Sequence, residues 1–173
     1  MKVLVVYFSQ TGNTEKIASA IFEEASISNE AELKKLDAVD PDSLNDYDQV
    51  FIGSPIHARS VAKEIKEFFT KLPQLPKLRI AGFVTHAATA YPKQTLDQMT
   101  QPFADVCNDK GMKYVGCFNC QGYLADFMHE AVKKMQKASD EEWQDKIKRM
   151  TGHPNADDEA DAKAFARSSI KSA

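Results

Sequence analysis

Four short and almost purely apolar runs, separated by helix-like stretches, constrain this chain more than any other feature. They span residues 3–8, 49–53, 80–85 and 113–119. They lack the polar alternation of a half-exposed strand, which indicates strands buried on both faces. A fifth and more polar run over residues 31–36 fits an edge strand. Strands alternating with helices predict βαβ units, and hence a parallel sheet with helices on both faces.

The stretches between the runs carry apolar residues at helical spacing. We expect one helix to begin at Thr14, whose hydroxyl would cap it. Apolar stripes within residues 61–72 and 96–107 predict two further helices. Pro102 predicts a kink or break in the second of these, and Gly111 is placed where a C-terminal cap belongs.

Beyond residue 120 no strand is expected. Apolar positions within residues 124–135 predict a helix, Ser139 and Glu142 form a capping box that opens a second, and Asn155 opens a third. We therefore expect one domain over residues 1–173. Its core would span 1–120, followed by a helical C-terminal extension over 121–173.

Charge and composition exclude several classes of protein. The formal net charge is −3, far from that of a nucleic-acid binder. No apolar run approaches the roughly 18 residues of a membrane span, and no secretory signal is recognisable. Three cysteines do not suggest a disulfide framework. We expect a cytoplasmic protein with no membrane segment and no nucleic-acid partner. Charge is uneven: residues 23–48 carry nine acids and two lysines (−7), and residues 49–120 five acids and nine bases (+4).

The loop between the first strand and the first helix reads Ser-Gln-Thr-Gly-Asn-Thr over residues 9–14. It combines hydroxyl and amide side chains, one glycine and the free N–H groups of a helix start, which together suit a phosphate. It matches neither a P-loop nor a dinucleotide fingerprint. The alternative is an ordinary polar loop. Two more loops, residues 53–59 and 85–92, follow strands that should end at the same edge, where doubly wound sheets bind ligands.

These three loops resemble those of the flavodoxin family. The resemblance covers about residues 1–120 and implies a doubly wound, five-stranded parallel α/β sheet in the order 2-1-3-4-5 with bound FMN. It implies phosphate contacts from Ser9, Gln10, Thr11, Gly12, Asn13 and Thr14. It places the flavin ring between Ser54, Pro55, Ile56, His57, Ala58 and Arg59 on one side and Thr85, His86, Ala87 and Tyr91 on the other.

Two positions depart from the pattern of this family. His57 stands where a tryptophan is common, and Arg59 stands near a position that is often glycine. A histidine stacks less strongly and can change charge near neutral pH. Arg59 beside a flavin would favour its negatively charged reduced form and so raise the potential.

Other reactive side chains are weaker candidates. Cys117 and Cys120 form a C-x-x-C, but within and just past a strand rather than at a helix start, so buried thiols are the favoured interpretation. His129 and His153 are expected at the surface, and Trp143 on a packing stripe. No metal site is expected.

Three functions stay open. The first is an FMN protein that shuttles one or two electrons between redox partner proteins, as a monomer or weak homodimer. The second is an FMN-dependent reductase of a quinone or other small substrate, in which His57, His86 and Arg59 would position substrate or donate a proton. The third is a flavin-free binding module whose first loop holds another anion.

Overall fold

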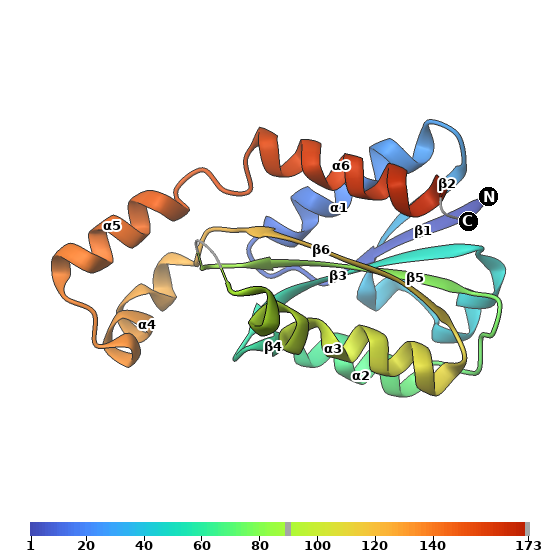
Figure 1. The fold of residues 1–173 in the computed structure, drawn as a ribbon, viewed down its shortest axis with the longest axis horizontal. Coiled ribbons are helices and arrows are strands. Elements are labelled where there is room, and N and C mark those ends of the chain that lie inside the picture. Colours follow the sequence, from blue (N-terminus) through green and yellow to red (C-terminus); the bar gives the residue numbers. More distant parts are fainter. Residues whose placement is uncertain (89–90, 172–173) are drawn as a thin grey trace.

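A central parallel sheet organises the computed structural model, which describes residues 1–88 and 91–171 (Figure 1). Its parallel strands lie in the order β2-β1-β3-β5-β6, with a short β4 paired antiparallel to β3. This confirms the predicted five-stranded order, since β4 only shifts the numbering. The strands are β1 (Lys2–Tyr7), β2 (Glu30–Lys35), β3 (Gln49–His57), β4 (Ser60–Val61), β5 (Arg79–His86) and β6 (Lys113–Gln121).

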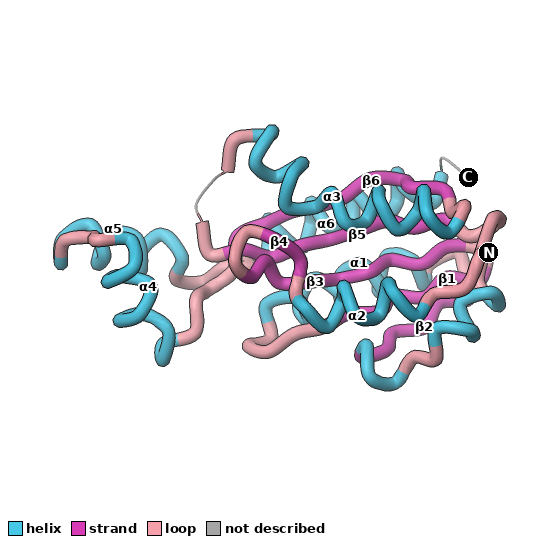
Figure 2. Tube along the Cα trace, turned by 90° about the horizontal axis from the view of Figure 1, so that it is seen from below, coloured by secondary structure: helices cyan, strands magenta, loops and turns pink. Residues whose placement is uncertain are grey.

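Helices cover both faces of the sheet, as predicted. On one face lie α1 (Asn13–Ser26) and α6 (Ala156–Lys171), and on the other lie α2 (Lys63–Lys71) and α3 (Lys93–Lys110) (Figure 2). Residues 3–7 of β1 are all buried, because alternate side chains enter a different apolar core on each face. β2 is the half-buried edge strand that its polar sequence predicts.

Three local predictions need correction or refinement. The N-cap of α1 is Gly12 rather than Thr14, because Thr14 is already the second residue of the helix, is buried, and uses its hydroxyl against β5. Helix α3 continues through Pro102 without a break. Val61 belongs to β4 and not to the following helix. Gly111 ends α3 in the left-handed conformation (φ 69°), as expected.

No α-helix lies between β2 and β3. This connection instead forms two 3₁₀ segments, Leu36–Ala38 and Pro41–Asp46. Asp40 caps the second segment by accepting a hydrogen bond from the amide of Asp42.

The residues after β6 divide into two parts. A 3₁₀ turn (Asp126–Met128), α4 (His129–Gln136) and α5 (Asp140–Met150) project beyond the carboxyl ends of the strands (Figure 1). We call residues 123–155 the arm. Helix α6 then returns to the sheet and packs beside α1. The Ser139–Glu142 capping box and the Asn155 cap are both present as predicted.

The arm has its own small packing centre. Trp143 is buried, as expected of a packing residue, and its ring meets that of His129 edge-on at 5.7 Å between centroids. His129 also bonds the carbonyl of Leu124, and His153 bonds Asp158 at 2.6 Å. Both histidines are half-buried, so the prediction of surface positions was wrong. In the part of the chain that the structure describes, no helix is long and apolar enough to cross a membrane.

Candidate functional site

The sheet order brings the three predicted loops to one edge. β1, β3 and β5 are neighbours, and Pro55 of β3 pairs in register with Thr85 of β5. The chain leaves β1 toward β2 on one side and resumes at β3 on the other, which makes this the switch point where doubly wound sheets bind ligands.

The loop over residues 9–14 forms an open helix start. Gly12 adopts φ 87°, and its amide donates a hydrogen bond to Ser9 Oγ at 3.1 Å. Gln10 and Thr11 are exposed. Among the described residues no side chain caps α1, so its first N–H groups point to an edge where an anion is favoured. Glu15 in that first turn is engaged by the Tyr7 hydroxyl at 2.5 Å.

Asn13 connects this loop to the end of β6. Its Nδ2 donates to Thr11 Oγ1 at 3.2 Å and to the carbonyl oxygen of Tyr123 at 2.7 Å. Gly122 makes the approach possible, since a Cβ at that position would lie 2.9 Å from Asn13 Nδ2. Gly122 and Tyr123 were missed by the sequence analysis, because nothing local to them signals a contact 110 residues away.

Thr14 and Thr85 join the first and third loops. Their hydroxyl oxygens lie 2.9 Å apart, and both side chains are buried. Since each hydroxyl can donate and accept, the pair satisfies two polar groups between α1 and β5. The structure therefore brings these two predicted residues together, in a contact that holds the loops rather than at an exposed surface.

The second predicted loop is a hairpin. β3 continues through His57 and pairs with β4, which leaves only Ala58 and Arg59 as the turn. Both have positive φ (47° and 64°), the pattern of a type I′ turn that matches the twist of the strands. His57, Ala58 and Arg59 are exposed at the tip.

Ser54, Pro55 and Ile56 lie at the base of this hairpin. The buried Ser54 hydroxyl donates to the Pro55 carbonyl at 2.8 Å and accepts the Ala62 amide at 2.8 Å. Ile56 is half-buried against the core on the α2 face. The Ser54 side chain thus stabilises the hairpin, while the backbone from Pro55 to the tip borders the edge.

The third loop is organised by His86, which is buried. Its Nδ1 lies 3.0 Å from the Ala88 carbonyl oxygen, and Nε2 lies 3.2 Å from Asn119 Oδ1. Because a carbonyl oxygen only accepts, Nδ1 carries the proton in the first bond. The Tyr91 ring meets the His86 ring edge-on at 5.0 Å between centroids. Ala87 is half-buried, and Thr89 and Ala90, also in the predicted loop, lie outside the described residues.

Gln121 is a further residue at this edge that the sequence analysis missed. It is paired with His86 in the β5–β6 register and is buried. Within the described residues its Nε2 has no hydrogen-bond partner. Leaving such a donor unpaired costs about 1–3 kcal/mol, so the position suits an acceptor from a ligand. Open helix N–H groups, a polar loop and this amide fit a phosphorylated, hydrogen-bonding cofactor.

The two cysteines of the C-x-x-C point away from each other. Cys117 packs against the core on the α2 face, whereas Cys120 belongs to the core on the α1 face. Burial raises the pKa of both thiols, which disfavours the reactive thiolate. Both facts support buried packing residues rather than a redox pair.

Comparison with known proteins supports one family. Residues 4–167 match the family model described as a flavodoxin domain. The uncharacterized protein MJ0298 of Methanocaldococcus jannaschii is 30% identical over 176 residues, covering 99% of each chain. The flavodoxin-like domain-containing protein BilS of Clostridioides difficile is 30% identical over 144 residues, covering 80% of this chain and 76% of that protein.

Solved structures agree on the fold. Oxidised flavodoxin 2 from Bacillus cereus superposes with a TM-score of 0.69, 18% identity and full coverage of both chains. The apo form of an NADH:FMN oxidoreductase, EMOB, superposes with a TM-score of 0.57 and 13% identity, covering 96% of this chain and 89% of that one. At these identities the likeness concerns the fold alone.

Proposed function

Because the chain belongs to the flavodoxin family, we propose that it binds FMN at the carboxyl edge of its sheet and carries one or two electrons between redox partner proteins. The observation that carries the proposal is the uncapped start of α1 behind the polar loop over residues 9–14. This arrangement offers N–H groups and a helix dipole to a phosphate without a cationic side chain.

Each loop has a distinct task under this proposal. Residues 9–14 hold the phosphate, with Asn13 fixing the loop to Tyr123. The hairpin backbone over residues 55–58 and the ring of Tyr91 border the flavin, and the buried Gln121 amide supplies a donor to it. Bound FMN would supply the redox chemistry itself, while the protein sets its orientation and electrostatic surroundings.

The test compares two glycines of matched geometry. Gly12 and Gly152 both have φ near +90° (87° and 88°), and a Cβ added to either would meet no other atom within 4 Å. Gly12→Ala and Gly152→Ala should therefore strain the backbone alike, by about 1–2 kcal/mol. Only Gly12→Ala should weaken FMN binding, measured by flavin fluorescence quenching. It should leave the affinity for riboflavin unchanged, because riboflavin lacks the phosphate.

The purified protein should also be yellow and be reduced in two one-electron steps in an anaerobic titration. A colourless protein with no affinity for added FMN would refute the proposal. Equal effects of the two glycine variants on FMN would show that the loop over residues 9–14 does not hold the phosphate.

One observation favours the second candidate, an FMN-dependent reductase. His57 and Arg59 stand exposed at the hairpin tip beside the proposed ring position, where a small substrate can reach them. Turnover of a quinone driven by NADH with the protein alone would support the reductase. Strict dependence on a separate reductase would support the carrier.

A further inference from the structure

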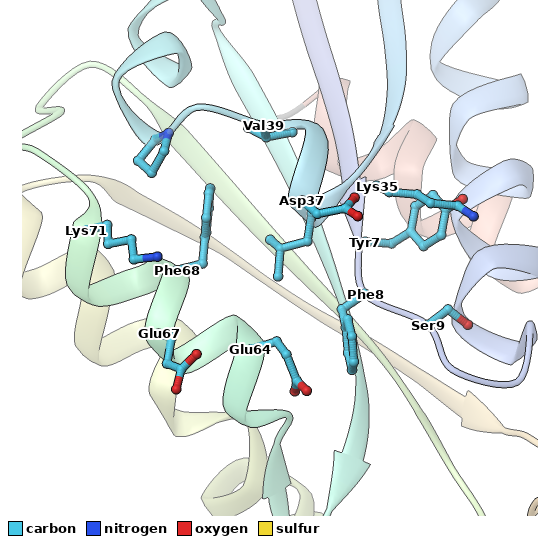
Figure 3. Close-up of a pocket in the computed structure, with 12 residues that line it drawn as sticks. Tyr7, Phe8, Ser9, Lys35, Asp37, Val39, Glu64, Glu67, Phe68 and Lys71 are labelled. Atoms are coloured by element: carbon cyan, nitrogen blue, oxygen red, sulfur yellow. The ribbon is translucent and has the colours of Figure 1, made fainter.

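A groove lies on the α2 face of the sheet, and Tyr7 and Ser9, at the end of β1 and the start of the loop over residues 9–14, line part of it (Figure 3). Its volume is about 530 Å³, and it opens where the 3₁₀ segments replace a helix between β2 and β3 (Figure 3). Phe8, Leu36, Val39, Pro41 and Phe68 give it an apolar lining. A sheet face normally covered by a helix is thus left partly open.

Three carboxylates and two lysines lie at the border of this groove. Asp37 lies on one side, and Glu64 and Glu67 of α2 lie on the other, with Lys35 and Lys71 also lining it (Figure 3). Glu67 has an exposed ion pair with Lys63 at 3.2 Å, which is easily exchanged for another cation. The groove suits an amphipathic helix with basic residues.

The arm presents such a helix. Phe127, Ala131 and Met135 follow one another at a spacing of four residues, and Phe127 and Met135 are 85% and 74% exposed. Lys134 and Lys137 are exposed beside them. Phe127 lies in the 3₁₀ turn directly before α4, and Met135 lies within α4. Large apolar side chains so exposed mark an interaction surface.

Among the described residues, the side-chain hydrogen bonds, ion pairs and ring contacts within the arm are made by residues other than Phe127, Met135, Lys134 and Lys137. Lys133 forms an ion pair with Asp140, and the His129 ring packs against the buried Trp143 ring. The base of the arm is tied to α1 at both ends, by Asn13 to the Tyr123 carbonyl and by Lys16 to the Pro154 carbonyl at 2.6 Å. The arm therefore projects in a defined direction (Figure 1).

We propose that α4 of one copy docks in the groove of a second copy of this chain. Apolar side chains meet an apolar lining, and Lys134 and Lys137 meet Glu64, Glu67 and Asp37. Groove and arm both reach the carboxyl ends of the strands, since Phe8 and Ser9 of the groove lining directly follow β1 and the arm follows β6. Two copies can therefore exchange arms reciprocally in a closed twofold dimer, which doubles the buried area.

Charge reversal tests this contact by sedimentation velocity of the full-length protein over low to high micromolar concentrations. Lys134→Glu with Lys137→Glu, and separately Glu64→Lys with Glu67→Lys, should each weaken dimerisation by about tenfold or more. All four changes in one chain should restore it. The matched control is Lys148→Glu with Arg149→Glu on α5, which should leave dimerisation unchanged.

Circular dichroism and flavin binding show whether each variant is folded, and none of the six positions belongs to the proposed cofactor site. A wild-type protein that stays monomeric throughout the range overturns the proposal. Loss of dimerisation from the arm variant alone, or no recovery in the fourfold variant, also overturns it, because α4 would then contact another surface. The contact positions 64, 67, 134 and 137 lie outside the proposed FMN site, and flavin binding is measured separately from dimerisation. A protein that stays monomeric and binds FMN would therefore refute the contact and leave the proposed function standing.

Discussion

Ala58 and Arg59 illustrate how single residues carry the cost of a functional geometry. Both hold positive φ in the hairpin turn, a conformation that costs a non-glycine residue about 1–2 kcal/mol. Ala58→Gly removes that cost at one position. The greater conformational freedom of glycine also stabilises the unfolded chain, which offsets about 0.4–1 kcal/mol of the gain. We expect a net gain of about 0.5 kcal/mol in the free energy of unfolding of the flavin-free protein, measured by urea denaturation.

The same substitution elsewhere should act in the opposite direction. Ala160 is exposed within α6, where Ala160→Gly should lower the free energy of unfolding by about 1 kcal/mol. A loss of stability from Ala58→Gly similar to that from Ala160→Gly would contradict a left-handed turn at residue 58.

Gly122 makes a second prediction at this scale. A Cβ there would lie 2.9 Å from Asn13 Nδ2 and 3.1 Å from Asn13 Cβ, so the whole Asn13 side chain must move. Gly122→Ala should therefore break the bond to the Tyr123 carbonyl and weaken FMN binding by about tenfold, with less effect on riboflavin. In an Asn13→Ala background the same change should have almost no further effect on FMN affinity. Additive effects in this double-mutant cycle would show that the two residues act separately.

The residue scale is also where prediction from sequence was weakest. The chemistry of residues 9–14 is local, so their loop could be predicted as a polar helix start. Thr14 and Ser54 are predicted cofactor-binding residues, and their hydroxyls also contact Thr85 and the Ala62 amide, which the sequence did not indicate. A hydroxyl can satisfy a ligand or a neighbouring strand equally well, and only the tertiary structure decides between them.

At the scale of elements, α6 is held to α1 by charge as well as by apolar packing. The Arg167 guanidinium donates two hydrogen bonds to Glu24, at 2.7 and 3.0 Å, and these hold the pKa of Glu24 below its usual value of 4.5. A lowered carboxyl pKa stabilises the fold above the unfolded pKa, and this contribution is lost as the pH falls through the folded pKa. Between neutral pH and about pH 3, the free energy of unfolding should therefore fall less in Glu24→Gln than in the wild type.

Urea midpoints at several pH values measure this effect. At neutral pH the variant should be less stable than the wild type, and the two curves should converge in acid. Glu141→Gln, at an exposed position at the start of α5, provides the control and should follow the wild type at every pH. A Glu24→Gln curve parallel to the wild type would show that the pair with Arg167 contributes no pH dependence.

The element scale was predicted well where periodicity was strong. The buried parallel strands, the α1, α3 and α5 helices, and the caps at Gly111 and Ser139 follow from patterns within a few residues. The hairpin of β3 and β4 was missed, because Ala58-Arg59 lacks the Asn-Gly or Asp-Gly signal of a type I′ turn. Apolar positions within residues 124–135 predicted one helix, whereas the structure has a 3₁₀ turn over Asp126–Met128 and begins α4 at His129, with Phe127 and Met135 exposed.

At the scale of the whole molecule, the potential of a bound flavin depends on where the charges lie more than on the net charge. The net charge is −3, yet residues 49–120 carry +4 and include both loops that border the proposed flavin ring. A positive surrounding favours a reduced flavin that carries negative charge. Arg59 is exposed at the hairpin tip, within one of these two loops. Its charge should raise the potential at which the flavin takes up its second electron.

Arg59→Glu should therefore lower that potential by an amount on the order of tens of millivolts, because it changes the local charge by two units. Since the position is exposed, the shift should shrink as ionic strength rises. Lys77→Glu makes the same change in net charge and serves as the control, because Lys77 lies just before β5, at the amino ends of the strands. Equal shifts from the two variants in spectroelectrochemical titrations would mean that net charge alone sets the potential. A shift confined to Arg59→Glu would locate the flavin beside the hairpin tip.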